Sequence, residues 1–426
     1  MNYLLYIHPD TLMLMDPMVP VGVVPLMNAS PLPVRGRLWN EVTDAEIAGA
    51  TVVALDLHWY PALPSYQQLA RRVRRVAPRT PIITGGYTAS AFAPELVRRG
   101  LADYVVTGDA DKPFPLLVTR LLDGGETAEI PNVVSARQDR PAHWSLTQEC
   151  FDVLNYRDYD FLPALKAYAR VIQEKALRRQ ARQSFFPYII INRGCNTDCP
   201  ACMGSAKLHK IWSGRGALWR SPAAVKQDIT HFSGLGYSFL CIYGEFVGCT
   251  PQAYQQEILA GPYETLIHHR FCHLPPPDDL RRLLAAFRGG CLEISSAAVS
   301  EESLLGRRFE ETVEVLNSDG RYTARLCLDY AVLGRKRDVA RRLLALRRRF
   351  PFTCSSASRW LPDIPIQPGA GLYLGPTEFD RYLKDVEKNM IDRANRFIFR
   401  HTNDYDSIYR LAHRADDWTN LARLFV

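Results

Sequence analysis

The sequence contains no apolar run that approaches the roughly 20 residues needed to span a bilayer. Its ten cysteines are too sparse among 426 residues for a disulfide framework, and no internal repeat is apparent. The first ten residues, MNYLLYIHPD, lack the basic region of a secretory signal. We therefore expect a cytoplasmic protein without a membrane span. In that reducing compartment, clustered cysteines bind metals or carry chemistry rather than form disulfides.

The charge balance is modestly basic, with a formal net charge of +7. Two basic clusters, at residues 175–182 and 335–349, are interpreted as solvated helix faces, with an anionic partner or substrate as the alternative. The sequence has no added basic domain and no aromatic-rich recognition motif, so a nucleic-acid partner is not expected.

Short apolar segments alternate with segments of helical spacing over residues 1–140. Strands are expected at Tyr3–Ile7, Thr51–Leu57, Pro81–Thr84 and Tyr104–Val106, and helices at Tyr66–Val76, Pro94–Gly100 and Phe114–Leu122. This order is typical of a parallel sheet with helices on both faces, and it predicts an α/β domain of Rossmann-like architecture. Ligands of such sheets bind beyond the carboxyl ends of the strands, so the turns after Leu57, Thr84 and Val106 are candidate binding positions.

A second alternating region, residues 185–376, follows a helical connector at residues 141–184. Its strands are expected at Phe186–Ile191, Phe239–Tyr243, Thr265–His269, Leu292–Ser295 and Arg325–Leu333, and its helices at Ala223–Phe232, Asp278–Phe287, Glu310–Asn317 and Lys336–Arg349. This order predicts a full or partial β/α barrel, in which chemistry lies at the carboxyl ends of the strands. Residues 377–426 are expected to form a helical C-terminal extension.

Three cysteines lie close together in the segment NRGCNTDCPACMGS, residues 192–205. Cys195, Cys199 and Cys202 have the spacing Cys-x-x-x-Cys-x-x-Cys on a loop that directly follows a predicted strand. Thiolates are soft, charged ligands that hold iron–sulfur clusters. Three of them can hold three irons of a cubane, and the fourth iron then keeps an open position for a small molecule. We therefore predict a four-iron, four-sulfur cluster with one open iron.

Two other interpretations of the cysteines are weaker. A zinc site usually has paired Cys-x-x-Cys motifs or added histidines, and the sequence has no second pair. His209 is the available fourth zinc ligand, although Lys207 and Lys210 flank it. Chance spacing of three inert cysteines is the remaining alternative.

The cysteine loop resembles the signature of the radical S-adenosylmethionine (SAM) superfamily. Similarity to the subgroup with an N-terminal cobalamin-binding-type domain extends to Thr84–Ser90 (TGGYTAS), Asp103–Asp109 (DYVVTGD), Gly214-Arg215, Arg220–Asp228 and Ile366–Gly369. The resemblance covers about residues 1–375. It implies a Rossmann-like domain followed by a partial barrel of (β/α)6 type. The resemblance does not extend to residues 377–426.

The resemblance also implies roles for individual residues. The three cysteines would ligate the cluster, and its open iron would bind the amino and carboxylate groups of SAM. Gly244 and Glu245 occupy the place of a Gly-Gly-Glu motif that contacts the methionine amino group, although Tyr243 replaces the first glycine. Glu293 and Ser295 match the place where a polar residue holds the ribose, with ordinary strand-end polar residues as the alternative.

Cobalamin is a further implication of the resemblance. Gly85, Gly86 and Gly108 would lie against the corrin and its nucleotide tail, because glycine lets backbone approach a large flat ligand. The Asp-x-His-x-x-Gly loop of many cobalamin proteins is absent: Asp56–His58 begins like it, but Pro61 stands where glycine is expected. We therefore interpret His58 as a turn or pocket residue. A domain that keeps the fold without the ligand is the alternative.

The activity implied is reductive cleavage of SAM and cobalamin-dependent methyl transfer to an unactivated carbon or phosphorus of a small metabolite or peptide, with flavodoxin or ferredoxin as electron donor. His268 and Tyr330 are candidate catalytic residues on barrel strands. Neighbouring strand residues face opposite ways, so only one of His268 and His269 is expected to point inward. The alternatives are a cobalamin-independent radical SAM enzyme (hydrogen abstraction, rearrangement or aminocarboxypropyl transfer) and a non-catalytic iron–sulfur or RNA-binding protein.

Overall fold

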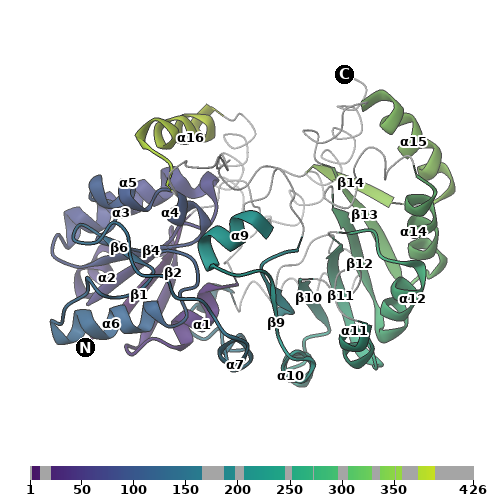
Figure 1. Ribbon diagram of the computed structural model, residues 1–426, viewed down its shortest axis with the longest axis horizontal. Coiled ribbons are helices and arrows are strands. Elements are labelled where there is room, and N and C mark those ends of the chain that lie inside the picture. Colours follow the sequence, from purple (N-terminus) through teal and green to yellow (C-terminus); the bar gives the residue numbers. More distant parts are fainter. Residues whose placement is uncertain are drawn as a thin grey trace. The chain divides into compact units, whose positions relative to one another are not determined.

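The computed structural model describes residues 2–9, 21–165, 187–196, 206–244, 252–271, 273–295, 306–328, 336–350, 352–356 and 373–388. The chain forms two compact units, and Figure 1 shows that each is built on its own sheet. Unit 1 comprises Met1–Tyr168, Gly194–Ala217 and Arg359–Asn403, and unit 2 comprises Ala169–Arg193, Leu218–Ser358 and Asp404–Val426. The described residues on either side of the central cysteine segment, 194–196 and 206–217, therefore group with the N-terminal sheet, and the domain boundaries given above stay a prediction.

The sheet of unit 1 has the strand order β2-β1-β3-β4-β5-β6 within the described residues. Its strands are β1 (Leu4–His8), β2 (Val34–Leu38), β3 (Val52–Asp56), β4 (Ile82–Gly85), β5 (Tyr104–Val106) and β6 (Val133–Ser135). All neighbouring pairs are parallel except β5 with β6. Strands β1 and β3 are buried along their whole length, which explains their near-continuous apolar sequences. The predicted Rossmann-like parallel sheet is confirmed.

Helices surround this sheet. They are α1 (Val23–Asn28), α2 (Asp44–Gly49), α3 (Leu63–Val76), α4 (Tyr87–Ala91), α5 (Ala93–Arg98), α6 (Pro113–Asp123), α7 (Gln148–Asp152), α9 (Ala206–Ser213) and α16 (Pro376–Lys388), with the 3-10 turn η1 (Tyr60–Ala62) before α3. Phe379 and Tyr382 of α16 are buried in the core of unit 1, where the Phe379 ring lies 5.3 Å from that of Phe92. The C-terminal extension is thus helical at its start and completes the N-terminal core.

The sheet of unit 2 has the order β14-β13-β12-β11-β10-β7, and every neighbouring pair is parallel. Its strands are β7 (Tyr188–Ile190), β10 (Phe239–Tyr243), β11 (Tyr263–Phe271), β12 (Phe287–Ser295), β13 (Tyr322–Leu328) and β14 (Phe352–Ser356). The connecting helices are α10 (Pro222–Gly234), α11 (Gln252–Ile258), α12 (Pro277–Ala286), α14 (Arg307–Ser318) and α15 (Lys336–Arg349). In the described part of unit 2, six parallel strands in sequential order with intervening helices confirm the partial β/α barrel.

Two small features frame the cysteine loop. The two-residue strands β8 (Asn192–Arg193) and β9 (Leu218–Trp219) pair antiparallel, so the chain leaves and returns at neighbouring positions. Helix α10 then begins at Pro222, and the hydroxyl of its N-cap residue Ser221 accepts a hydrogen bond from the backbone of Ala224, as the Ser-Pro pattern predicts.

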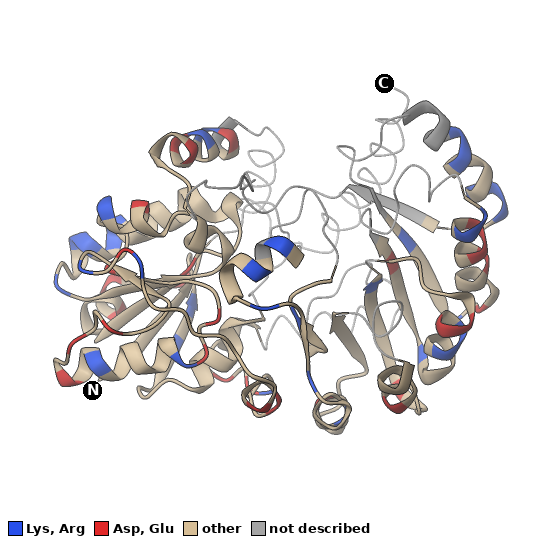
Figure 2. Cartoon of the chain, in the orientation of Figure 1, with Lys and Arg blue, Asp and Glu red and all other residues tan. Residues whose placement is uncertain are grey.

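The basic cluster of α15 is a solvated helix face. Figure 2 shows Lys and Arg along this helix. Leu343 and Leu346 are buried, whereas Arg342 and Arg349 form ion pairs with Glu310 of α14. The other predicted cluster, residues 175–182, lies outside the described residues. Among the described helices, none has the length and apolarity that crossing a membrane requires.

Candidate functional site

The cysteine loop begins on a backbone turn that only glycine adopts readily. Gly194 has a φ of 84°, and a Cβ on it would collide with the ring of His209. Cys195 follows and is partly exposed. Cys199 and Cys202 lie outside the described residues, so the set of three ligands stays a prediction. Within the described ranges, no group of three His, Cys, Asp or Glu side chains is arranged to hold a metal.

The position of His209 bears on the zinc alternative. Its ring is buried against Gly194, and its Nε2 atom lies 3.4 Å from Nη1 of Arg215. A ring nitrogen that faces a guanidinium accepts a hydrogen bond from it, and its lone pair is then not available to a cation. This contact disfavours zinc binding through that nitrogen.

A row of polar side chains crosses one face of the sheet of unit 2. In the strand register, His268 lies between Cys241 and Cys291, and two residues further along β11 Arg270 pairs with Glu293. Residues two apart share a face, so these side chains form one polar surface. The opposite face carries Phe271, Leu292, Ile294 and other apolar residues that are fully buried. The candidate residues His268 and Glu293 are therefore brought together on one side of the sheet.

Glu293 is buried and held between two guanidinium groups. Its Oε1 atom lies 2.5 Å from Nε of Arg270, and its Oε2 atom lies 3.5 Å from Nε of Arg325. Burial opposes ionisation of the carboxyl, but the two arginines outweigh it and lower its pKa. Glu293 is thus an ionised carboxylate already engaged by the chain, and its contact with ribose stays a prediction.

The strand bounds correct one expectation about the histidines. His268 and His269 do not end their strand, because β11 continues to Phe271. Both rings are buried, and His269 packs edge-on against Phe271 on the apolar face, with ring centroids 4.7 Å apart. The expectation that one histidine points to each face therefore agrees with the register. Tyr330 lies outside the described residues.

The remaining SAM-binding candidates are only partly described. Gly244 follows β10 with a φ of 110°, and a Cβ there would collide with the side chain of Asn192. The glycine is therefore required by the chain's own packing. Glu245 lies outside the described residues, and of Ser295 the structure describes only its place at the end of β12.

The glycines assigned to cobalamin lie at the carboxyl edge of the sheet of unit 1. Gly85 ends β4. Gly86 has a φ of 107°, and a Cβ on it would lie only 2.7 Å from Cα of His58. Gly108, with a φ of 64°, packs against the carbonyl of Trp212. Gly86 and Gly108 thus allow close approach within the chain, and contact of these turns with a corrin stays a prediction.

His58 has the surroundings of a packing residue. Its ring lies edge-on to Trp59 and Tyr87, with centroids 4.1 Å and 5.0 Å away. Burial lowers its pKa to about 4, and the charge of Asp56 only partly compensates.

The same edge carries a histidine that the sequence pattern did not single out. His8 ends β1, and its Nδ1 atom lies 3.2 Å from Oδ2 of Asp56, which ends β3. The Nε2 atom of His8 is buried and has no hydrogen-bond partner among the described residues. A histidine ring that is oriented by a carboxylate, and whose second nitrogen still lacks a hydrogen-bond partner, is typical of a ligand-binding residue. The sequence signal that could have identified His8 is its position at the end of the first strand.

The buried His268 should make unfolding pH-dependent. Burial lowers its pKa to about 4 in the folded protein, against about 6.5 in the unfolded chain. Between these values the unfolded state binds the extra proton, so stability falls as the pH falls. From pH 7 to pH 5, urea titration should show a loss about 2 kcal/mol larger in the wild type than in His268→Gln.

The matched control for this prediction is His231→Gln, because His231 is exposed on α10. It should keep the wild-type pH dependence. Equal pH dependence in His268→Gln and the wild type would contradict the assignment of a neutral, buried His268.

Comparison with known proteins places this geometry in context. No family model matches the chain. Over 158 residues, 35% of this chain, the sequence is 28% identical to hopanoid C-3 methylase of Methylococcus capsulatus, and the match spans only 27% of that protein's length.

Two solved structures of the radical SAM methyltransferase TsrM from Kitasatospora setae have a similar fold. One, with tryptophan substrate and the SAM analogue aza-SAM bound, gives a TM-score of 0.62 at 16% identity and covers 83% of this chain and 72% of that chain. The other, with cobalamin and a [4Fe-4S] cluster bound, gives a TM-score of 0.61 at 15% identity and covers 83% and 74%. The expected fold, a Rossmann-like parallel sheet and a partial β/α barrel, is confirmed by its similarity to these two structures.

Proposed function

We propose that this protein is a cobalamin-dependent radical SAM methyltransferase. It would cleave SAM reductively and transfer a methyl group to an unactivated carbon or phosphorus of a small metabolite or peptide. The observation that carries the proposal is the Cys-x-x-x-Cys-x-x-Cys loop, which follows β7, the first strand of a six-stranded parallel β/α sheet. The methyl-transfer part is supported by the likeness to TsrM and to hopanoid C-3 methylase.

The residues that would hold the iron–sulfur cluster are Cys195, Cys199 and Cys202. When bound, the cluster supplies the electron that breaks a carbon–sulfur bond of SAM. The partly exposed thiol of Cys195 fits this role. A flavodoxin or ferredoxin is the proposed electron donor.

SAM would be held at the carboxyl ends of the strands of unit 2, by Gly244, Glu245, Glu293 and Ser295. The polar row of which Glu293 is part fits a charged, polar ligand, whereas the opposite face carries buried apolar side chains such as Phe271, Leu292 and Ile294. His268 lies on the same face and is the described candidate for contact with the substrate.

Cobalamin would be held at the carboxyl edge of the sheet of unit 1. The buried, unsatisfied Nε2 of His8 fits a large ligand that carries many polar groups, and Asp56 keeps the ring oriented. The backbone at Gly85, Gly86 and Gly108 would line the same edge.

Reconstitution tests both parts of the proposal. The protein is loaded anaerobically with iron, sulfide and hydroxocobalamin, desalted, and examined by metal analysis and visible spectroscopy. We expect about one cobalt for each chain, and consumption of SAM with a strong reductant. Cleavage of SAM without bound cobalt would leave a cobalamin-independent radical enzyme. If the protein with a fully loaded cluster formed no cleavage product of SAM, the proposal that it is an enzyme would be rejected.

A further inference from the structure

We infer that Asp109 and Arg215 are positioning residues for the iron–sulfur cluster, because their ion pair fixes the end of α9, the helix that follows the cysteine loop, to the segment after β5 of unit 1. The inference rests on the proposed function, since it assigns the pair a part in holding the cluster. Neither residue is among the cluster ligands or the predicted SAM contacts.

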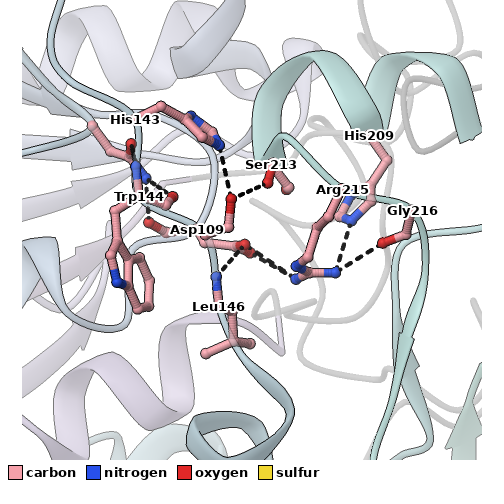
Figure 3. A network of polar contacts seen from close by, with 10 residues as sticks. Asp109, His143, Trp144, Leu146, His209, Ser213, Arg215 and Gly216 are labelled. Carbon is pink, nitrogen blue, oxygen red and sulfur yellow. Dashed lines mark hydrogen bonds and ion pairs between the residues drawn. The ribbon is translucent and has the colours of Figure 1, made fainter.

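The ion pair joins segments that are far apart in the sequence. Asp109 follows β5 and Arg215 follows α9, yet Nη2 of Arg215 lies 3.1 Å from Oδ2 and 3.3 Å from Oδ1 of Asp109 (Figure 3). The side chains are 4% and 17% exposed, so water competes little for either group. Oδ2 also accepts a hydrogen bond from the backbone of Leu146 at 3.0 Å, which fixes the carboxylate.

A second set of contacts holds the carboxyl end of α9 at the same place. The hydroxyl of Ser145 donates to the carbonyl of Ser213 at 2.6 Å and lies 3.0 Å from Nε2 of His143 (Figure 3). Gly108 packs directly on the carbonyl of Trp212, where a Cβ would collide with it. The last turn of α9 is therefore docked by both side chains and backbone.

Asn132 locks the segment that receives these contacts. Its Nδ2 atom donates to the carbonyls of Asp109 and Trp144, each at 2.8 Å, and its Oδ1 atom accepts from the backbone of Trp144 at 2.8 Å. Asn132 has a φ of 60°, in the left-handed region that asparagine tolerates better than most residues. The backbone around Asp109 is thus held by hydrogen bonds that do not involve Arg215.

The guanidinium of Arg215 extends the connection to the first cysteine. Its Nη1 atom donates to the carbonyl of Gly216 at 3.0 Å and lies 3.4 Å from Nε2 of His209. The His209 ring covers Gly194, the residue before Cys195. Arg215 therefore connects Asp109 to His209 of α9 and, through the His209 ring, to the residue before Cys195.

This connection matters because three thiolates must be held together to bind one cluster. Partners that orient metal ligands typically change metal affinity 10- to 100-fold when they are removed. Loss of the Asp109–Arg215 pair should therefore weaken retention of the cluster more than it weakens the fold.

The test compares Arg215→Ala, Arg215→Lys and Asp109→Asn with the wild type after identical reconstitution. The measurements are iron and sulfide per chain, the rate at which an iron chelator bleaches the visible absorbance, and the EPR spectrum of the reduced cluster. Arg72→Ala is the matched control, because Arg72 of α3 also bonds an aspartate, Asp44, and a backbone carbonyl, that of Val42.

We expect Arg215→Ala and Asp109→Asn to lose the cluster to the chelator about 10-fold faster than the wild type or more, with Arg215→Lys intermediate and Arg72→Ala unchanged. The circular dichroism spectrum should stay that of the wild type. If Arg215→Ala does not fold, Arg215→Lys decides.

Wild-type retention and an unchanged EPR spectrum in the folded Arg215 variants would overturn the inference. A wild type that takes up no iron and sulfide would instead overturn the proposed function, and this inference with it.

Discussion

Cys199→Ala is expected to abolish the iron–sulfur absorbance of the reconstituted protein. With Cys199 removed, two cysteines of the loop remain. A cubane cluster that the protein ligates at only two irons is lost to solvent and reductant. Iron and sulfide per chain should fall to the level of a mock reconstitution. The measurements are the visible spectrum and chemical analysis of both elements.

The control for this prediction is Cys150→Ala. Cys150 lies exposed on α7, so its replacement removes an accessible thiol without touching the loop. It should keep full absorbance. Retention of a complete cluster in Cys199→Ala would reject the ligand assignment.

Asp228→Leu is expected to destabilise unit 2 by about 3–5 kcal/mol. Asp228 and Arg220 form an ion pair in which the side chains are 1% and 2% exposed. Without the carboxylate, the Arg220 guanidinium stays buried and uncompensated. The loss would also act on β7, because the backbone N–H of Arg220 donates to the carbonyl of Ile191 at 2.8 Å, directly after that strand.

Urea titration measures the effect, and a double variant separates its causes. Arg220→Met with Asp228→Leu replaces both charges by apolar groups of similar size, and it should recover most of the lost stability. Asp278→Asn breaks an exposed pair with Arg281 and should cost below about 1 kcal/mol. A stable Asp228→Leu single variant would contradict the assigned role of the pair.

Strands with two buried faces were predictable from sequence. Phe239–Tyr243 and Tyr104–Val106 match the structure residue for residue, and the apolar run at Thr51–Leu57 contains β3. Burial on both faces requires a continuous apolar segment, and such a segment is easily recognised. The helix Lys336–Arg349 also has its predicted bounds, because its leucines recur at helical spacing.

Other strands were missed for physical reasons. β2 is an edge strand of sequence VRGRL that pairs with β1. Its two arginines are reached by solvent, so the segment lacks the apolar run that predicts a strand. In the structure β12 begins at Phe287, whereas the sequence predicts a strand only from Leu292. In the added part, Gly290 passes so close to the backbone of Ile267 that no side chain would fit at that position. A Gly-Gly pair in a sequence normally indicates a turn, so the sequence does not predict that residues 287–291 belong to the strand.

The site was predictable only where its residues are neighbours in the sequence. The three cysteines define a motif by spacing alone. Asp109 and Arg215 are 106 positions apart, and only the fold brings them together. Both lie in segments that resemble the radical SAM subgroup, but the resemblance gives neither residue a role. The pairing of His8 with Asp56, 48 positions apart, is likewise evident only in the fold.

EPR spectroscopy of the reduced cluster tests the open iron most directly. The reconstituted wild type is reduced by one electron and its spectrum is recorded before and after addition of SAM, with adenosine as the control because it lacks the amino and carboxylate groups. We predict that SAM shifts the g values and that adenosine does not, because only SAM can chelate the iron without a cysteine. Identical spectra with and without saturating SAM would contradict an open iron held by Cys195, Cys199 and Cys202.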